Sequence, residues 1–327
     1  MSDRIRATYF VTGAAGFIGA SVSQILLKQG HRVFGIDNLN DAYDVRLKRW
    51  RLKQLRVQKD FYFETMDILK RSAMDQLLGR VKPVAIINLA ARAGVRQSVQ
   101  DPWIYIDTNV TGTLNLLDLC VKHGIKKFVQ ASTSSLYGIQ EQPCTEDLPT
   151  GRPLSPYAAS KKASEALCHS YYHLHGLDIS VLRYFTVYGP AGRPDMSPMR
   201  FTKWIFEKEP VRIFGDGKQS RDFTFVDDIA RGTILALRPL GFEIINLGSN
   251  HPVRLLDTIQ ILEKRIGKEA LIQLEDPQPA DVATTWADIS KAANLLDWQP
   301  MISVESGLEE LVDWYRKNRE WACDLKL

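Results

Sequence analysis

The chain has 327 residues and a formal net charge of +4, and 45% of its residues are hydrophobic and 24% are charged. This length is sufficient for one large domain or two smaller ones with a substantial core. The mild positive charge argues against nucleic acid as the main partner and gives only weak support for an acidic small ligand.

Hydropathy and cysteine spacing indicate the compartment. No apolar run approaches the roughly 20 residues that span a bilayer. The N-terminal residues lead into a short apolar strand without the apolar segment of a signal peptide. The four cysteines show no paired spacing, which is typical of reduced thiols. We therefore expect a soluble, cytoplasmic protein without membrane contact.

The first half of the chain alternates short apolar runs with longer amphipathic ones. This alternation predicts parallel βαβ units in a doubly wound, Rossmann-type α/β sheet. Helical patterns include Ser21–Gln29 and Trp103–His123. The predicted strands are Tyr9–Thr12, Arg32–Ile36, Phe61–Phe63, Val84–Asn88, Lys127–Gln130 and Ile179–Arg183.

Proline and glycine become frequent after Tyr184, in runs such as GPAGRPDMSP and FGDGKQS. This change predicts a Rossmann domain over residues 1–183 and a smaller, mixed, loop-rich lobe over residues 184–327. The run EIINL (Glu243–Leu247) has the composition of another buried strand. We therefore expect the two parts to interleave, with the chain returning to the sheet at about residues 243–249.

Three glycines, Gly13, Gly16 and Gly19, follow the first predicted strand in the run YFVTGAAGFIG. Glycine permits a tight turn and lets backbone N–H groups approach a pyrophosphate, whose charge the helix N-terminus favours. Asp37 ends the second strand, where an acid accepts hydrogen bonds from the adenosine ribose and repels a 2′-phosphate. The sequence thus predicts bound NAD rather than NADP or an empty tight turn. Asp67, after the third strand, either lies near the adenine or caps a helix.

A second motif is SPYAASK, in which Ser155 and Pro156 are typical of a helix N-cap and first turn. Tyr157 and Lys161 are then four residues apart and share one helical face. A phenol loses its proton near pH 10, too high for a base at neutral pH. A nearby ammonium and a positive nicotinamide ring would both favour the phenolate. The pair is thus a candidate for proton transfer.

Taken together, TGAAGFIG, Asp37, NLAA (Asn88–Ala91), ASTSSLYG (Ala131–Gly138) and YAASK resemble an extended short-chain dehydrogenase/reductase. This is the family of NAD-dependent sugar-nucleotide epimerases, dehydratases and decarboxylases, and the match covers nearly the whole chain. The resemblance implies tightly held NAD, a catalytic triad of Thr133, Tyr157 and Lys161, and a C-terminal lobe that grips a nucleoside diphosphate sugar. The implied cofactor-binding residues are Gly13, Gly16, Phe17, Ile18, Gly19, Asp37, Asn38, Asp67, Ile68, Leu89, Ala90, Ala91, Asn109, Tyr157, Lys161 and Tyr184.

The residues after Thr133 discriminate among these reactions. Family members that eliminate water or decarboxylate carry acids here, in patterns such as T-D-E-x-Y-G and T-S-E-x-Y-G, whereas this chain has Ser134 and Ser135. A serine is a poor substitute for a carboxylate that moves protons around a sugar ring. The missing acid favours an epimerase, although the two serines can also simply fill a turn.

Thr186 and the run GPAGRPDM (Gly189–Met196) resemble the branch that acts on uronates, the UDP-glucuronate 4-epimerases. Neutral-sugar 4-epimerases usually have asparagine at the position of Thr186. The resemblance implies that UDP-glucuronate and UDP-galacturonate interconvert by C4 oxidation with bound NAD to a 4-keto intermediate, rotation and re-reduction. The intermediate is a β-keto acid, so its carboxylate must be held out of alignment for CO2 loss. The implied residues for this task are Ser134, Ser135, Thr186 and Arg193, with Arg96 a weaker candidate on the sugar side.

The resemblance places the binding site for the nucleotide part of the substrate in the second lobe. Val211–Ile229 resembles the family's UDP-binding stretch, in which Arg221 pairs with the diphosphate and Arg212 and Phe214 flank the uracil. Asp281 matches an acid that contacts the uridine. The family often has arginine at the position of Gln278, so one phosphate contact differs. For Arg193, a loop arginine that bonds backbone carbonyls is the alternative.

Other interpretations of the sequence were weighed against a UDP-glucuronate 4-epimerase. His169 and His173 lack the acid of an HExxH motif, so we expect no metal. The basic run Leu47–Lys59 is interpreted as a helix with one apolar face (Leu47, Trp50 and Leu55) and a solvated basic side, not as a nucleic-acid site. The competing functions are a 4-epimerase of neutral UDP-sugars, a UDP-glucuronate decarboxylase and a non-enzymatic NAD- or RNA-binding protein. The resemblance also implies a homodimer formed through helices that flank the sheet.

Overall fold

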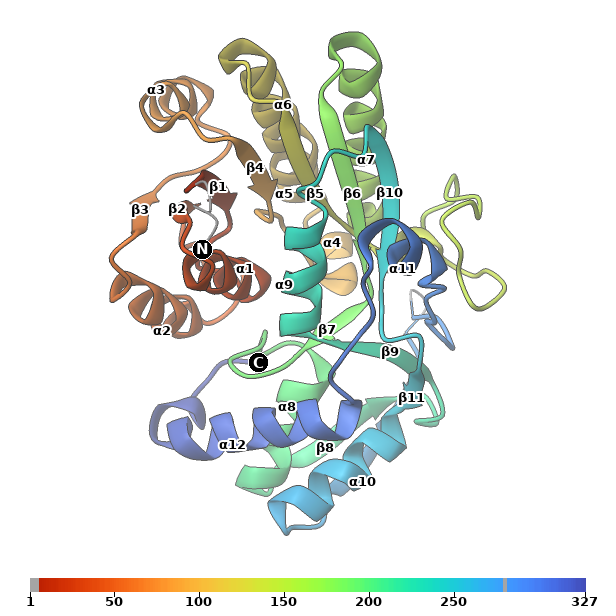
Figure 1. Cartoon of the computed structure of the whole chain (residues 1–327). Helices are drawn as coiled ribbons and strands as arrows, with labels where there is room; N and C mark the ends of the chain where they lie inside the picture. The colour runs from red at the N-terminus through yellow and green to blue at the C-terminus, as the bar shows by residue number, and fades with distance from the viewer. Residues whose placement is uncertain (1–5, 279–280) are drawn as a thin grey trace.

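Seven parallel strands form the large sheet, in the order β10-β6-β5-β4-β1-β2-β3 (Figure 1). The computed structural model describes residues 6–278 and 281–327. The order is that of a doubly wound Rossmann sheet with one further strand at its edge, so the predicted fold class is confirmed. The strands are β1 (Thr8–Thr12), β2 (Arg32–Asp37), β3 (Phe61–Thr65), β4 (Ala85–Asn88), β5 (Lys127–Thr133), β6 (Asp178–Tyr184) and β10 (Phe242–Leu247).

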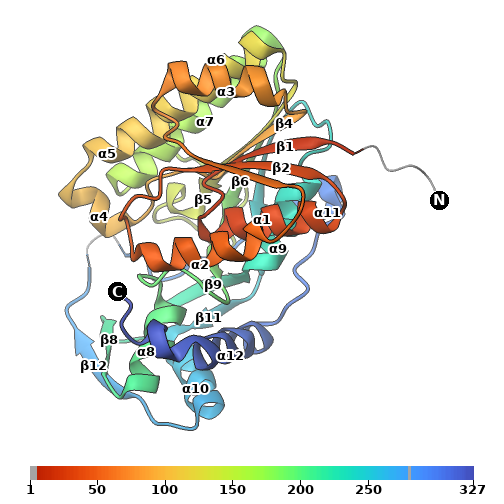
Figure 2. The same cartoon turned by 90° about the vertical axis from the view of Figure 1, so that its left-hand side faces the viewer.

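Helices cover both faces of this sheet (Figure 2). The apolar runs of the strands are buried on both sides, as the all-buried β4 and β5 illustrate, because a parallel sheet is sandwiched between its crossover helices. One face is covered by α3 (Arg71–Val81), α6 (Gly112–His123) and α7 (Pro156–His175), and the other by α1 (Phe17–Lys28), α2 (Val45–Arg56), α9 (Val226–Leu235) and α11 (Ser290–Leu296).

The predicted helix Trp103–His123 is interrupted by a π-helical segment. It consists of α5 (Trp103–Tyr105), the π segment Ile106–Thr111 and α6. Within the π segment, Asn109 is buried and the adjacent Thr108 lines the main cavity. The short helix α4 (Val95–Gln100) precedes this region.

The smaller lobe has its own core beneath the large sheet (Figure 1). Two small sheets, β11-β9-β7 and β12-β8, pack with three helices. Residues beyond 184 also return to the large sheet through α9, β10 and α11, so the two parts interleave. The lobe contains β7 (Thr186–Tyr188), α8 (Ser197–Glu207), β8 (Pro210–Phe214), β9 (Ser220–Phe225), β11 (Pro252–Arg254), α10 (Leu255–Ile266), β12 (Leu271–Glu275) and α12 (Val304–Ala322).

The direction of the strands determines where a ligand can lie. After β1 the chain builds outward to β2 and β3, and it then crosses to β4 on the other side of β1. The crevice outside the carboxyl ends of β1 and β4 is the usual ligand site of such a sheet. Over the described residues, no helix is both long and apolar enough to cross a membrane.

Candidate active site

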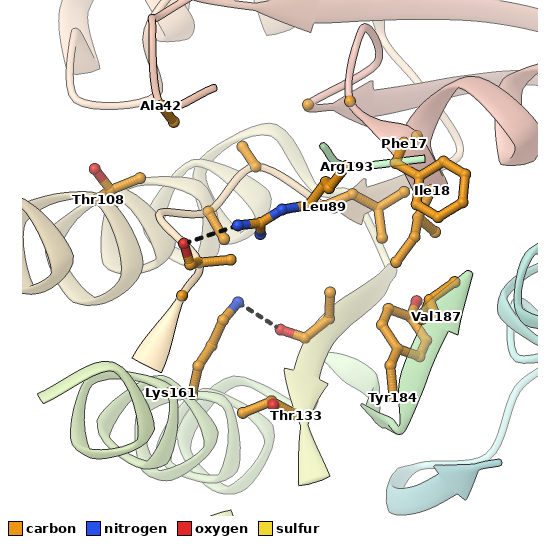
Figure 3. A pocket seen from close by; sticks show the side chains of 18 of the residues that line it. Phe17, Ile18, Ala42, Leu89, Thr108, Thr133, Lys161, Tyr184, Val187 and Arg193 are labelled. Atoms are coloured by element: carbon orange, nitrogen blue, oxygen red, sulfur yellow. Dashed lines mark hydrogen bonds between the residues drawn. The ribbon is translucent and has the colours of Figure 1, made fainter. Parts of the chain in front are cut away.

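A cavity of about 340 Å³ lies at the carboxyl ends of the large sheet, between the glycine-rich turn, the start of α7 and the loop after β7 (Figure 3). Its size is typical of a small-molecule site. Most of the residues expected at a cofactor and sugar site line it: Gly13, Gly16, Phe17, Ile18, Gly19, Asp37, Asn38, Asp67, Ile68, Leu89, Ala90, Ala91, Thr133, Ser134, Ser135, Tyr157, Lys161, Tyr184, Thr186 and Arg193.

The turn after β1 has no room for a Cβ at any of its three glycines, and at Gly16 a Cβ would lie 2.8 Å from the carbonyl oxygen of Gly13. Gly13 has a φ of +66°, and a Cβ there would lie 2.9 Å from the backbone of Leu89 and Ala90. A Cβ on Gly19 would collide with the carbonyl of Gly13. Gly16 is the N-cap of α1, and it supplies no side chain to the N–H groups of the first turn. These N–H groups and the close backbone packing fit a pyrophosphate.

Asp37 lies at the end of β2, buried and facing the cavity. Its carboxylate accepts a hydrogen bond from the N–H of Leu39 at 2.8 Å and pairs with the ammonium of Lys48 at 3.4 Å. Lys48 also donates to the side chain of Asn40 at 3.0 Å. The carboxylate is thus fixed at the place where the ribose of a dinucleotide belongs.

Asp67 is not a helix cap, because the N-cap of α3 is Lys70. One of its oxygens closes a turn by accepting from the N–H of Leu69 at 2.9 Å. The other accepts from the amide of Asn38, also at 2.9 Å. The capping alternative for Asp67 is therefore wrong, and its side chain lines the cavity beside Asn38.

Helix α7 brings the tyrosine and the lysine to the cavity. Ser155 is its N-cap, accepting from the N–H of Ala158 at 3.2 Å, and Pro156 is its first residue, as predicted. Tyr157 and Lys161 consequently lie one turn apart on the face toward the cavity. The ammonium of Lys161 donates to the carbonyl of Ala131 at 2.9 Å (Figure 3).

Burial opposes ionisation of both groups. It raises the pKa of the Tyr157 phenol, and a hydrogen bond with Thr133 and the charge of Arg193 counteract that rise only in part. Burial also lowers the pKa of Lys161 to about 8, so the ammonium is mostly charged at neutral pH. A tyrosinate in this cavity therefore needs positive charge beyond that of the protein side chains.

The hydroxyl run turns around the end of β5. Thr133 is the last residue of the strand, and a 3-10 turn over Ser134–Leu136 follows it. The Thr133 hydroxyl accepts from the N–H of Ser135 and donates to the Ser135 hydroxyl, both at 3.2 Å. All three hydroxyl residues line the cavity. They present neutral donors and acceptors close to Tyr157.

Arg193 enters the cavity from the loop after β7 (Figure 3). Its guanidinium forms a two-pronged pair with Asp195, at 3.0 and 2.6 Å, and donates to the carbonyl of Ala93 at 3.2 Å. Asp195 therefore partly offsets its charge. The alternative role of Arg193, bonding backbone carbonyls, applies to its contact with Ala93.

Acids are absent from the part of the cavity near Tyr157. Among the described residues that line it, the carboxylates are Asp37 and Asp67, which follow β2 and β3, whereas Tyr157 and Thr133 lie beside β5. Within residues 6–278 and 281–327, no group of three His, Cys, Asp or Glu side chains could hold a metal ion.

A second cavity of about 140 Å³ shares Ser134, Ser135 and Thr186 with the first and is lined by Arg221 and Asp281. The guanidinium of Arg221 donates to the carbonyls of Ser220 and Ala283 at 2.8 and 3.4 Å. No carboxylate among the described residues forms an ion pair with it, and burial lowers its pKa. An anion beside Arg221 would restore the lost solvation of its charge.

The structure does not bring Arg96, Arg212 and Phe214 to either cavity lining. Arg96 pairs with Asp281 at 2.7 Å, and its guanidinium lies 4.1 Å from the centre of the Phe214 ring. Arg212 is largely exposed and lies 3.7 Å from Glu275. Arg96 therefore lies beside Asp281 and Phe214, two of the residues expected at the nucleotide end.

Asn109 also lies behind the cavity rather than in its lining. Its buried amide bonds the N–H and carbonyl of Arg92 and the hydroxyl of Ser160, each at 2.9 Å. Through these contacts Asn109 holds the loop after β4 against α7.

Arg200 was not singled out from the sequence. It lies on α8, and its buried Nε has no partner among the described residues. Burial is the first cause that lowers its pKa, followed by the charges of Arg96 and Arg212. The carboxylates of Asp195 and Glu275 act in the opposite direction. An arginine with an unbonded buried nitrogen beside two other arginines is a candidate contact for an anion.

The basic run Leu47–Lys59 is only partly as interpreted. Leu47 and Leu55 are buried and Arg49 is solvated, but Lys48 and Arg51 are also buried, at 5% and 3% exposure. The interpretation of the basic side as wholly solvated is therefore wrong. The signal was present in the spacing, because positions 47, 48, 51, 52 and 55 form one helical stripe.

A buried ion pair lies beneath the hydroxyl run. Glu165 on α7 binds Arg183 on β6 through two contacts at 3.0 and 2.8 Å, and both side chains are 2% exposed. Glu165 also accepts from the hydroxyl of Ser132 at 2.6 Å, and Arg183 donates to the Tyr137 hydroxyl at 3.0 Å. The pair thus connects α7, β6 and the end of β5, which together carry Tyr157, Tyr184 and Thr133.

Comparison with known proteins gives consistent matches over nearly the whole chain. Residues 10–311 match the family model described as GDP-mannose 4,6 dehydratase. The chain is 56% identical to a UDP-glucuronate 4-epimerase of Thermodesulfobacterium geofontis, over 98% of this chain and 99% of that protein. It is 40% identical to the UDP-glucuronic acid 4-epimerase of Bacillus cereus crystallised with UDP-glucuronic acid and NAD, with a TM-score of 0.90 over 95% of this chain and 99% of that one. The UDP-glucose 4-epimerase of Thermotoga maritima with UDP-glucose matches at 31% identity and a TM-score of 0.88, with the same coverage.

Proposed function

The chain belongs to the GDP-mannose 4,6 dehydratase family of extended short-chain dehydrogenases/reductases, and we propose that within it this chain interconverts UDP-glucuronate and UDP-galacturonate. The enzyme is an NAD-dependent nucleotide-sugar 4-epimerase. C4 of the hexuronate is oxidised to a ketone, the sugar turns over, and the ketone is reduced from its other face. Residues 1–183 hold the cofactor and residues 184–327 most of the sugar nucleotide, with the interleaving described above and with Ser134 and Ser135 of the first part facing the sugar.

One observation carries this proposal: hydroxyls and one arginine, and no carboxylate among the described lining residues, surround Tyr157. A dehydratase or decarboxylase of this family needs an acid there to move protons. A 4-epimerase needs only one base at C4 and a restraint on the carboxyl group. The family model carries a dehydratase description, so this local difference is what selects the epimerase reaction.

Tyr157 takes the proton of the C4 hydroxyl in the forward half-reaction and returns a proton in the reverse half. Thr133, which hydrogen-bonds the phenol, aligns the sugar oxygen and lowers the pKa of Tyr157. Lys161, held by the carbonyl of Ala131, adds a positive charge on the same helical face. When bound, NAD supplies the hydride acceptor and donor at C4.

The carboxylate of the sugar is held by Ser134, Ser135, Thr186 and Arg193. Several short donors fix the C5–C6 bond away from the ketone π system, which slows loss of CO2. At the other end, Arg221 binds the diphosphate, which gives its buried charge the anion it lacks in the protein. Asp281, held by Arg96, contacts the uridine.

The decisive experiment is to incubate the protein with UDP-glucuronate and follow the anomeric proton by NMR. Growth of a UDP-galacturonate signal to an equilibrium mixture, without added cofactor beyond NAD, is the expected result. A pentose nucleotide with released CO2 would identify a decarboxylase instead. An unchanged spectrum with NAD bound would disprove the proposed activity.

Arg193→Ala is expected to discriminate the uronate reaction from a neutral-sugar epimerase. Loss of a charge-assisted contact in a buried site costs about 2–5 kcal/mol, so kcat/KM for UDP-glucuronate should fall by roughly 10²-fold or more. Binding of UDP-glucose, which has no carboxylate, should change little. Arg96→Ala is the matched control, since its contacts with Asp281 and Phe214 should affect both sugars equally. Equal losses on both sugars in Arg193→Ala would remove it from the carboxylate role.

We also propose a homodimer and a cytoplasmic location. Support for the compartment comes from four cysteines that are all free thiols. Support for the dimer comes from Leu114 and Val121 on α6 and Leu174 on α7, which are 38%, 39% and 70% exposed on adjacent helices of one sheet face. Apolar surface on neighbouring helices is typical of an interface.

The double variant Leu114→Lys, Val121→Lys is expected to be a monomer of 37.1 kDa. Light scattering of the unaltered chain is expected to give twice that mass. Charged residues on this face cannot be desolvated at low cost. Val57→Lys, at the end of α2 and 77% exposed, is the control and should leave the mass unchanged. A dimer that persists in the double variant would place the interface elsewhere.

A further inference from the structure

Arg51 is a buried cation without a buried counter-ion. It lies on α2 with 3% exposure, and among the described residues no carboxylate forms an ion pair with it. Burying a guanidinium in this way is costly unless its donors are fully used. The donors of this side chain bond backbone carbonyls and one hydroxyl, so Arg51 can fix the position of those groups.

The donors of Arg51 reach both walls of the main cavity. On the cofactor wall, Nη1 donates to the carbonyl of Ala15, inside the glycine-rich turn, at 3.2 Å. On the sugar wall, Nε and Nη2 donate to the carbonyl of Ala191 at 3.0 and 2.6 Å, and Nη2 reaches that of Gly192 at 3.3 Å. Helix α2 lies between the large sheet and the small lobe, where one side chain can contact both (Figure 2).

The sugar-wall loop is in a conformation that needs such support. Ala191 has a φ of +52°, the left-handed region that a residue with a Cβ adopts at a cost. Both hydrogen bonds from Nε and Nη2 end on its carbonyl. Arg193 follows two residues later and enters the cavity. The position of Arg193 thus depends on the backbone that Arg51 holds.

Two aromatic side chains complete the contact. The Tyr43 hydroxyl accepts from Nη1 at 2.8 Å. The rings of Phe17 and Tyr43 lie 5.7 and 5.5 Å from the guanidinium carbon. Both rings line the cavity, and Phe17 begins α1 directly after the turn. A lysine has one nitrogen and cannot make these contacts on both walls.

We propose that Arg51 is a positioning residue that couples the cofactor turn to the loop carrying Arg193, and so sets both NAD retention and the preference for a carboxylated sugar. This rests on the proposed function only for the sugar. Through Ala15 it fixes the turn that faces the pyrophosphate. Through Ala191 and Gly192 it fixes the loop from which Arg193 reaches the substrate carboxylate.

The first test measures the cofactor alone. Protein stripped of NAD is titrated with NAD, following the rise in thermal midpoint and the dissociation constant by calorimetry. Arg51→Lys is expected to weaken NAD binding by about tenfold, as for the loss of one or two hydrogen bonds to a charged group. Arg49→Lys, an exposed arginine of the same helix, is the control and should bind NAD like the unaltered chain.

The second test measures the sugar preference without turnover. In NAD-loaded Tyr157→Phe protein, the dissociation constants of UDP-glucose and UDP-glucuronate are determined. The preference for the carboxylated sugar is the dissociation constant of UDP-glucose divided by that of UDP-glucuronate. We expect Arg51→Lys to lower this preference by about tenfold and Arg193→Ala to lower it at least as far. Because Arg51 acts through Arg193, adding Arg51→Lys to Arg193→Ala should lower the preference no further.

The outcomes separate the inference from the function itself. A lower thermal midpoint with unchanged NAD affinity and unchanged preference would mean that Arg51 is only structural, and would overturn the proposal. Additive losses in the double variant, or a loss confined to one wall, would overturn the coupling. If the unaltered chain fails to epimerise UDP-glucuronate, the proposed function fails, while the NAD titration still tests the cofactor half.

Discussion

Replacing Tyr157 by phenylalanine is expected to lower kcat for UDP-glucuronate by about 10²–10⁴-fold, the range that a general acid–base contributes. In the mechanism proposed above the phenol accepts the proton of the C4 hydroxyl. The carboxylates among the described lining residues, Asp37 and Asp67, follow β2 and β3 and cannot replace it. The measurement is the initial rate of UDP-galacturonate formation by NMR, with protein matched for NAD content.

The control for this variant is Tyr172→Phe, which removes a hydroxyl from the same helix at a position 38% exposed to solvent. It should leave kcat unchanged. The dissociation constant of UDP-glucuronate should also change little in Tyr157→Phe, since the ring remains. If Tyr157→Phe retained more than a tenth of the unaltered rate, the proton would have to leave through another group.

Replacing Glu165 by alanine is expected to lower the free energy of unfolding by about 3–5 kcal/mol, because it leaves the buried guanidinium of Arg183 without its partner. Both side chains are 2% exposed, so water cannot take the place of the carboxylate. The measurement is the shift of the urea midpoint at unchanged slope. The variant also loses the acceptor of Ser132, next to Thr133, so a lower kcat should accompany the lower stability.

Two further variants serve as controls for the Glu165→Ala prediction. Glu64→Ala breaks an ion pair with Arg80 whose side chains are 37% and 67% exposed, and it should cost about 1 kcal/mol or less. Glu165→Met combined with Arg183→Met removes both charges, and it should recover part of the loss seen in Glu165→Ala. A Glu165→Ala variant no less stable than Glu64→Ala would show that the buried pair does not hold these elements together.

Local sequence signals predicted most of the sheet and part of the site. The six apolar runs of the first half and the run EIINL are strands of the large sheet, and their ends differ from the prediction by a few residues. SPYAASK contains its own helix start, so the face shared by Tyr157 and Lys161 follows from the helical period alone. The glycine turn is local in part, since a Cβ on Gly19 would collide with Gly13, whereas a Cβ on Gly13 would meet the distant backbone of Leu89 and Ala90.

Features that depend on contacts between distant parts of the chain were not predicted correctly or were not predicted at all. Arg96 was expected on the sugar side, but its partner Asp281 is 185 residues away. Asp67 was given a helix-cap alternative, which is excluded because the N-cap of α3 is Lys70, and its carboxylate instead accepts from Asn38 at the end of a neighbouring strand. The π turn before α6 has no signature in the hydrophobic period, because Asn109 is held by groups after β4 and on α7.

The sequence by itself determined the fold class and the spacing of the tyrosine–lysine pair, because each follows from the hydrophobic or helical period of short stretches of chain. Only the tertiary structure decided which charges of the basic helix are buried and which walls they join. Arg51 and Ala191 are 140 residues apart, and nothing in either segment specifies the other. Burial arises only when the layers of the fold are assembled. The sequence around Arg51 therefore does not tell whether its guanidinium faces water or, as in the structure, the carbonyls of Ala15, Ala191 and Gly192.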